Sequence, residues 1–215
     1  MDGQVQDQES VVIETAGLQG LLGVPADPAG VVVFAHGSGS GRFSPRNNYV
    51  AEGLRGAGFA TLLVDLLTES EEGDRARVFD IALLASRLIA ATRWLSDVSR
   101  LAQLPVGYFG ASTGAGAALL AAASEPARIG AIVSRGGRPD LAGSPALAHV
   151  RAPTQLIVGE RDLPVIELNR EAMRHLRCEH EIVIVPGAHH LFEEPGALDL
   201  VIGHATRWFS NHLAA

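Results

Sequence analysis

The chain has 215 residues, 47% hydrophobic and 19% charged, which is typical of one soluble globular domain spanning residues 1–215. Its formal net charge of −7, with no basic patch in the sequence, argues against nucleic acid and anionic membranes as main partners. All 17 basic residues are arginine, and the lack of lysine excludes Schiff-base chemistry, a Ser–Lys pair and a phosphate-binding lysine of the Walker type.

The first ten residues, MDGQVQDQES, are acidic and polar in character and lack the apolar core of a secretion signal. No apolar stretch is long enough to span a bilayer. The single cysteine, Cys178, excludes an intrachain disulfide and a cysteine-rich zinc site. These features predict a cytoplasmic protein in a reducing compartment, and they leave the oligomeric state open.

Short apolar runs alternate with helical patterns along the chain. The first two runs, joined through Ala16 and Gly17, are predicted to form a hairpin. The predicted strands are 11–14, 18–24, 31–35, 59–64, 106–109, 129–134, 154–158 and 181–185. The predicted helices are 48–57, 75–101, 112–124, 164–176 and 197–213, with a loop over 66–74 and an irregular segment over 135–150.

This alternation predicts an α/β fold with a doubly wound, mostly parallel sheet of about seven to eight strands flanked by helices. The connection between the strands 129–134 and 154–158 is too short for a full helical lid, so we expect little or no lid. In such sheets, ligands bind beyond the carboxyl ends of the strands. The residues directly after each strand are therefore the candidates for function.

A G-x-S-x-G pattern, Gly110 to Gly114, follows the strand 106–109 and opens a helix. A serine on such a sharp strand-to-helix turn exposes its hydroxyl at the top of the sheet, beside the helix N-terminus. Ser112 is therefore the candidate nucleophile. A chance match is the alternative, because the chain contains 24 glycines.

A nucleophilic serine needs a base, and the base needs a group that orients it. Asp162 follows the strand 154–158, and His189 and His190 follow the last strand. The order Ser, Asp, His is that of α/β-hydrolases. A helix N-cap is the alternative for Asp162, and a packed or solvent-facing imidazole is the alternative for each histidine. A metal site is not expected, because adjacent histidines in an extended loop point apart and no third ligand has suitable spacing.

The glycine-rich segment His36 to Gly41 follows the strand 31–35. Its glycines alternate and Pro45 comes soon after, so it does not match a dinucleotide-binding loop. We expect an oxyanion hole there, in which the backbone N–H groups of Ser38 and Thr113 stabilise the developing negative charge. His36 is expected to orient this loop rather than to act as a base.

Arginines near the predicted site are candidates for binding substrate. Arg135 and Arg138 follow a strand end, so one of them could bind a substrate carboxylate; a surface position or a contact with Asp140 is the alternative. Arg42, near the oxyanion loop, is a similar candidate. The acidic residues of the loop 66–74 are expected to form a solvated surface.

Five segments together resemble the dienelactone hydrolase-like branch of the α/β-hydrolases, in particular a group sometimes fused to a phosphoribosyltransferase domain. They are FAHGSGSGRFSPRNNYVAEGLRGAGFATLLVDLLT, GASTGAGAAL, VSRGGRPDLAG, GERDLPV and VPGAHHLFEEPG. The resemblance implies an α/β-hydrolase fold and a triad of Ser112, Asp162 and His190. Dienelactone hydrolase itself has a cysteine nucleophile where this chain has serine, so the resemblance implies no substrate.

The leading interpretation is a serine hydrolase that cleaves a small ester or thioester through an acyl-enzyme, without cofactor or metal. Acyl transfer to an acceptor other than water is a variant of this chemistry. The alternative from another class is a non-catalytic scaffold that binds a small ligand or a protein partner.

Overall fold

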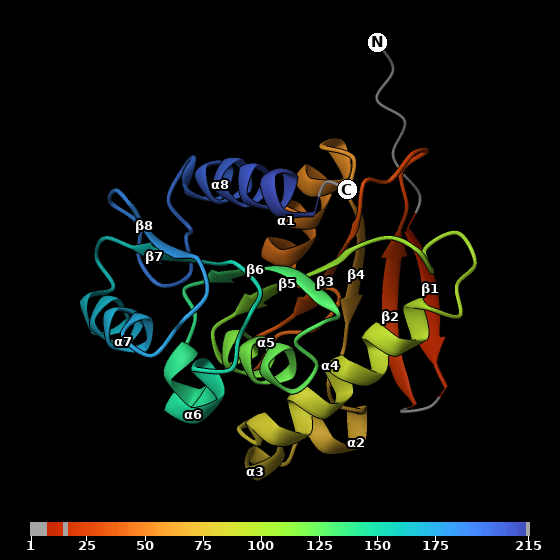
Figure 1. Cartoon of the computed structure of the whole chain (residues 1–215), viewed down its shortest axis with the longest axis horizontal. Coiled ribbons are helices and arrows are strands. Elements are labelled where there is room, and N and C mark those ends of the chain that lie inside the picture. The colour runs from red at the N-terminus through yellow and green to blue at the C-terminus, as the bar shows by residue number, and fades with distance from the viewer. Residues whose placement is uncertain (1–7, 15–16, 214–215) are drawn as a thin grey trace.

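The chain folds around a twisted sheet of eight strands within the residues that the computed structural model describes, 8–14 and 17–213 (Figure 1). The strands lie in the order β1-β2-β4-β3-β5-β6-β7-β8. Each neighbouring pair from β4 to β8 is parallel, whereas β1 and β2 form an antiparallel hairpin at one edge. The strands are β1 (Gln8–Ile13), β2 (Leu18–Gly23), β3 (Val31–Ala35), β4 (Ala60–Val64), β5 (Val106–Ala111), β6 (Ile129–Arg135), β7 (Thr154–Gly159) and β8 (His180–Val185).

This topology confirms the predicted α/β-hydrolase fold with a mostly parallel sheet of seven to eight strands. The predicted hairpin is also confirmed, with Ile13 opposite Leu18. Ala16, which was expected in its turn, lies outside the described residues.

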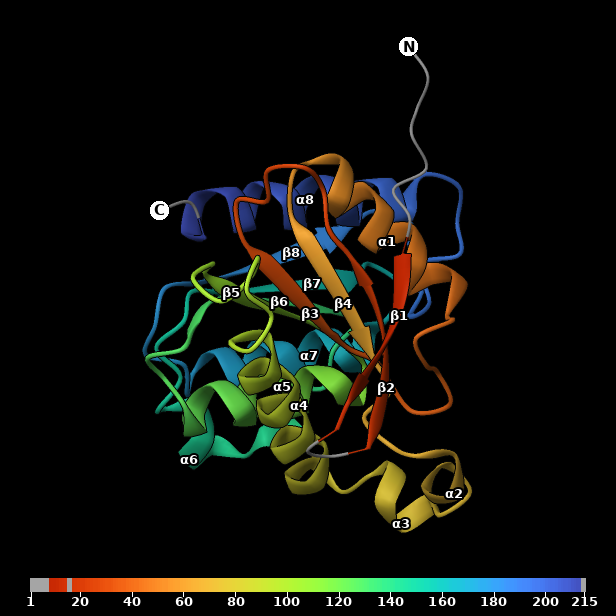
Figure 2. The ribbon, with the colours of Figure 1, turned by 90° about the vertical axis from the view of Figure 1, so that its right-hand side faces the viewer.

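Helices cover both faces of the sheet (Figure 2). Helices α1 and α8 lie on one face, and α4, α5 and α7 lie on the other. In this described part of the chain no helix is both long and apolar enough to cross a membrane. The helical segments are α1 (Pro45–Gly56), α2 (Glu69–Glu72), α3 (Arg75–Val78), α4 (Ile81–Leu95), α5 (Thr113–Ser124), η1 (Pro139–Ala142), α6 (Ser144–Leu147), α7 (Leu163–Met173) and α8 (Ala197–His212).

The central strands are apolar along their whole length because helices cover both of their faces. Every residue of β3 and of β4 is buried. On the α1/α8 face, the rings of Phe34 and Phe109 pack with their centroids 4.8 Å apart. On the opposite face, the buried Tyr108 hydroxyl lies 2.7 Å from the Thr92 hydroxyl of α4. This packing fixes the strand ends, from which the site residues project.

The long helix predicted over 75–101 is wrong: the structure has α3, a break, and then α4. Asp80 starts the second helix, because its Oδ1 accepts the Leu83 N–H at 2.9 Å, which satisfies one of the free N–H groups of a helix N-terminus. Asp74 caps α3 in the same way, through the Ala76 N–H. The predicted loop 66–74 contains α2, and the irregular segment 135–150 contains η1 and α6.

Glu71 links the α2–α3 segment (residues 69–78) to α4 through ion pairs. Its two carboxylate oxygens accept from the Arg87 guanidinium at 2.6 and 2.7 Å, and Oε1 also accepts from Arg77 at 2.7 Å. Its Oε2 accepts the Thr68 N–H at 2.9 Å, which completes a capping box on α2. Hydrogen bonds from Arg87 first, and from the Thr68 backbone next, lower the pKa of Glu71 to about 2.

Replacing Glu71 by glutamine is expected to lower the free energy of unfolding at neutral pH by about 1 kcal/mol, a value reduced for solvent screening. A carboxyl group whose pKa is lowered on folding stabilises the protein above its usual pKa of 4.5, and this contribution is lost as the pH falls towards 2. Urea unfolding at a series of pH values should therefore show a difference between wild type and Glu71→Gln that disappears in acid.

Glu72→Gln is the matched control, because the structure shows no ion pair between Glu72 and any residue in 8–14 or 17–213. An equal effect of the two substitutions at neutral pH would contradict the role given to Glu71.

Candidate active site

Ser112 lies on the turn between β5 and α5, with φ 49° and ψ −123°. Only one other non-glycine residue among those described, Phe192, has a positive φ. Such backbone strain is characteristic of functional turns. The flanking glycines allow it: a Cβ on Gly110 would lie 2.5 Å from the Cα of Ala115, and one on Gly114 would lie 2.0 Å from the carbonyl oxygen of Ala35. The predicted strand–turn–helix context of Ser112 is therefore observed.

His190 and Asp162 are in direct contact. The Nδ1–H of His190 donates to Oδ2 of Asp162 at 2.6 Å. Asp162 occupies the N-cap position of α7, the alternative that the sequence left open, yet its side chain makes no capping hydrogen bond. The carboxylate contacts the histidine instead, which leaves Nε2 as the basic nitrogen of His190.

His189 has a separate carboxylate partner. Its Nδ1 contacts Oε1 of Glu194, which also accepts the His189 backbone N–H at 3.1 Å. Each histidine of the pair therefore has a carboxylate of its own, and only His190 contacts the acid that follows β7. The family resemblance implied His190 rather than His189 as the catalytic histidine, and this choice stays a prediction.

The segment after β6 connects the serine turn (residues 110–114) to the histidine loop (residues 186–192). The Ser112 N–H donates to the carbonyl of Arg135 at 3.4 Å, and the Ser112 carbonyl accepts the Arg138 N–H at 3.0 Å. Between these contacts, Gly136 lies against the histidine loop: a Cβ there would be 3.0 Å from the carbonyl oxygen of His190 and 3.3 Å from the ring of Phe192. Phe192 itself is 1% exposed.

The glycine-rich segment, here called the oxyanion loop (residues 36–41), packs against the serine turn. A Cβ on Gly37 would lie 2.8 Å from the Cβ of Ser112. The Ser38 N–H, a predicted oxyanion donor, donates to Oγ1 of Thr113 at 3.0 Å. This contact could not be predicted from the sequence, because it depends on the loop crossing the first turn of α5.

His36 holds the oxyanion loop in place. Its Nδ1 lies 3.0 Å from the carbonyl oxygen of Gly37, and its Nε2 lies 3.2 Å from the Leu66 nitrogen. The second contact requires Nε2 to accept the Leu66 N–H, so Nδ1 carries the proton. Both ring nitrogens are thus engaged, as expected for an orienting residue rather than a base.

A pocket of about 680 Å³ lies between the oxyanion loop and the α2–α3 segment. Ser38 and Thr113 are among the residues that line it, and its apolar lining includes Leu67 and Leu84. Glu69 and Glu72 also line it, and Glu71 forms the ion pairs described above. The solvated surface predicted for the acidic residues is observed at Glu69, Glu72 and Asp74, which are exposed. Glu71 differs, because it is half-buried in its ion pairs, and the segment also forms one wall of the pocket.

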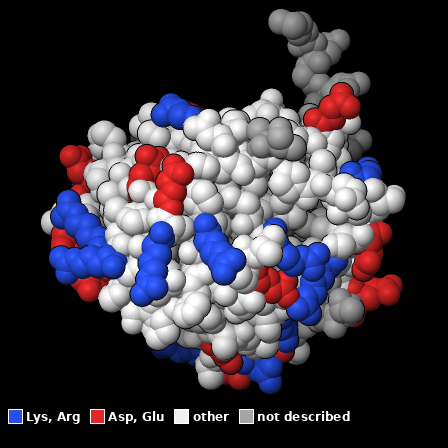
Figure 3. Space-filling view, in the orientation of Figure 1, with Lys and Arg blue, Asp and Glu red and all other residues white. Residues whose placement is uncertain are grey.

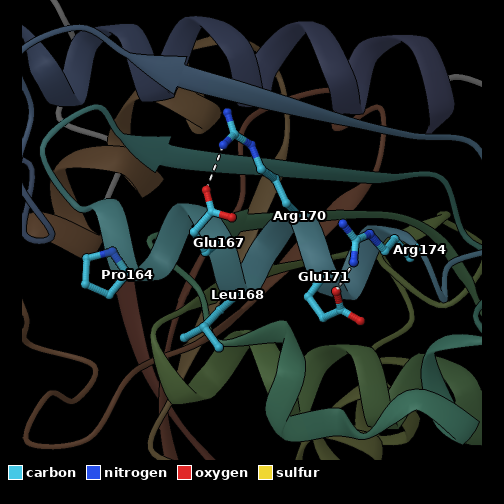
Figure 4. A pocket seen from close by; sticks show the side chains of 6 residues that line it. All are labelled: Pro164, Glu167, Leu168, Arg170, Glu171 and Arg174. Carbon is cyan, nitrogen blue, oxygen red and sulfur yellow. Dashed lines mark hydrogen bonds and ion pairs between the residues drawn. The ribbon is translucent and has the colours of Figure 1, made fainter.

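A second pocket, of about 500 Å³, lies on the outer side of α7 (Figure 4). Its lining residues belong to α7 and to Arg174, which directly follows the helix. Ion pairs join Glu167 to Arg170 at 2.7 Å and Glu171 to Arg174 at 2.5 Å. No residue of the serine turn or of the histidine loop lines it. On the face shown in Figure 3, acidic and basic side chains are interspersed.

The three candidate arginines have different environments. Arg42 contacts Asp65 through its guanidinium, and its backbone N–H donates to the same carboxylate at 2.6 Å. Arg138 binds Asp140 through two hydrogen bonds of 2.7 and 2.8 Å, as the sequence allowed. The alternative of a surface position is wrong for Arg135, which is 8% exposed. Sequence reasoning missed the role of Asp65, although its place directly after β4 was a usable signal.

Residues 18–207 match the family model described as "Dienelactone hydrolase family". The chain belongs to the dienelactone hydrolase family. A solved family structure, a dienelactone hydrolase from Anabaena variabilis, is 56% identical, with a TM-score of 0.88, and the match covers 96% of this chain and 97% of that one.

More distant solved structures share the fold of this dienelactone hydrolase family member. Est1E from Butyrivibrio proteoclasticus is 14% identical with a TM-score of 0.81, and the match covers 97% of this chain and 99% of that one. Carboxyl esterase 2 from Tuber melanosporum is 18% identical with a TM-score of 0.74, covering 96% of this chain and 87% of that one.

A curated relative from Mycobacterium tuberculosis, named as a phosphoribosyl transferase, is 59% identical over 213 residues. The match covers 99% of this chain and 48% of the relative, so the chain spans about half the length of that protein. The relative's name agrees with the resemblance to a group sometimes fused to a phosphoribosyltransferase domain, and it describes the longer protein.

Proposed function

We propose that the chain is a serine hydrolase that cleaves a small ester or thioester through an acyl-enzyme on Ser112. The observation that carries this proposal is the contact of His190 with Asp162 at 2.6 Å, in a chain whose serine occupies a strained strand-to-helix turn. Membership of the dienelactone hydrolase family supports hydrolysis as the type of reaction.

In the proposed reaction, Oγ of Ser112 attacks the carbonyl carbon of the substrate while Nε2 of His190 removes the hydroxyl proton. Asp162 keeps the proton on Nδ1 and stabilises the imidazolium that forms. The tetrahedral intermediate collapses, His190 gives its proton to the leaving alcohol or thiol, and an acyl-serine remains. Water, deprotonated by His190, then attacks the acyl-serine and releases the carboxylic acid and the free serine.

The oxyanion of the intermediate would accept hydrogen bonds from the backbone N–H groups of Thr113 and Ser38, each contributing about 3 kcal/mol in the transition state. In the structure the Ser38 N–H donates to the Thr113 hydroxyl. We propose that this hydroxyl holds the oxyanion loop against α5 and that the Ser38 N–H turns to the substrate oxygen as charge develops. Thr113 is 4% exposed, so its side chain has little freedom to move away.

Replacing Thr113 by valine, which has a similar shape but no hydroxyl, is expected to lower kcat/KM for ester hydrolysis about fivefold, because the hydrogen bond that places Ser38 contributes about 1 kcal/mol. Thr113→Ser should retain most of the activity. An unchanged or faster rate for the valine variant would show that the hydroxyl only competes for the Ser38 N–H.

The proposed function is tested by incubating the protein with a serine-directed fluorophosphonate and measuring its intact mass, followed by peptide mapping. One adduct per chain, located on Ser112, is the expected result. If folded protein forms no adduct and cleaves no short-chain ester, the serine is not activated, and the non-catalytic binding scaffold replaces the proposal.

A further inference from the structure

Arg135 is a buried cation without a carboxylate partner. It ends β6, is 8% exposed, and forms no ion pair with any residue that the structure describes. Its Nη1 is buried and has no hydrogen-bond partner within the described chain. Burial first, and the positive charge of Arg46 next, lower the pKa of Arg135 to about 10, so the guanidinium stays charged at neutral pH.

A charged group in such surroundings destabilises a folded protein, because it loses its hydration and gains no counter-ion. The contact with the ring of Phe109 offsets little of this cost, since Cζ lies 6.0 Å from the ring centroid, at the outer limit of a cation–π interaction. The nearby cation, Arg46, has its own partner in Glu193 at 3.0 Å. Arg135 therefore has no counter-ion of its own among the described residues.

Arg135 lies beside the proposed nucleophile, Ser112. Arg135 pairs in register with Ala111, and its carbonyl accepts the Ser112 N–H. The next residue, Gly136, lies against His190. The Arg135 side chain projects on the face that α1 and α8 cover, as do its register partner Ile157 and Phe109.

We propose that Arg135 binds an anionic group, a carboxylate or a phosphate, carried by the ester that Ser112 attacks. A guanidinium offers two parallel N–H donors to either oxyanion, and burial strengthens such charge-assisted bonds. Binding would supply the missing counter-ion. This inference rests on the proposed serine hydrolase function and adds the class of substrate to it.

The first test compares two esters with the same leaving group on the wild-type protein: 4-nitrophenyl butyrate, and mono-4-nitrophenyl succinate, whose acyl chain ends in a carboxylate. The expected result is a kcat/KM about ten- to hundredfold higher for the succinate ester, as for a hydrogen bond to a charged group. Competitive inhibition by succinate or by inorganic phosphate then identifies which oxyanion the site prefers. Equal kcat/KM values together with no inhibition by either anion would overturn the inference.

The second test is Arg135→Met. The preference for the succinate ester should fall to about one, and the melting temperature should stay equal or rise, since removing an uncompensated buried charge stabilises a protein. Arg138→Met, three residues later and bound to Asp140, is the matched control and should keep the preference. An arginine with only a structural role would instead give a lower melting temperature and an unchanged preference, which would overturn the inference.

Fluorophosphonate labelling distinguishes a failure of the inference about Arg135 from a failure of the proposed function. If Ser112 is labelled and the protein shows no preference between the esters, the inference about Arg135 fails while the serine hydrolase stands. If folded protein is not labelled and neither ester is cleaved, the proposed function itself fails.

Discussion

Replacing Ser112 by alanine is expected to lower kcat/KM for ester hydrolysis roughly 10⁴- to 10⁶-fold, because the proposed acyl-enzyme can no longer form. The oxyanion hole and the bound substrate would account for the residual rate. Alanine has the same backbone preferences as serine at φ 49°, so the melting temperature should change little. Ester kinetics and thermal unfolding of the same preparations check both expectations.

Ser124→Ala is the matched control, because Ser124 lies at the other end of α5 and its hydroxyl donates to the Leu120 carbonyl at 2.9 Å. This variant should hydrolyse esters at the wild-type rate and should bind one fluorophosphonate. If Ser112→Ala is folded and retains more than about a tenth of the wild-type kcat/KM, the nucleophile lies elsewhere.

Replacing Asp162 by asparagine is expected to lower kcat about 10⁴-fold, because an amide can stabilise the wrong tautomer of His190 and cannot balance the charge of the imidazolium. The 2.6 Å contact with Nδ1 is the basis of this expectation. His190→Gln should be equally slow. The double variant should be no slower than His190→Gln alone, since the two residues act as a unit.

The neighbouring pair provides the control. Glu194→Gln and His189→Gln remove a carboxylate and an imidazole that form a similar contact one residue away, and both variants should keep near-wild-type kinetics. If Glu194→Gln is as slow as Asp162→Asn, the assignment of the orienting acid is wrong.

Much of the fold follows from local patterns in the sequence. The five-residue apolar run of β3 predicts a strand buried on both faces, and short connections between such strands leave few topologies open. The candidate site follows from the same pattern, because parallel strands place Ser112, Asp162 and His190 at one edge of the sheet.

Other features depend on contacts between distant segments and could not be predicted. Asp80 has an ordinary helical pattern on both sides, so only the structure shows that its side chain starts a new helix. The contact between Ser38 and Thr113 needs the loop after β3 to cross α5. Arg135 is buried because α1 and α8 cover that face of the sheet, whereas the sequence around it is typical of an exposed turn.

The side chain of Phe192 makes the histidine loop part of the hydrophobic core. Its ring belongs to the same core cluster as Phe109 and Phe209, and its backbone is held at φ 55° two residues after His190. The loop is therefore anchored in the domain core, and releasing it would expose a large buried ring to water. The position of the proposed base is thus fixed before any substrate arrives, so binding would not have to order this loop.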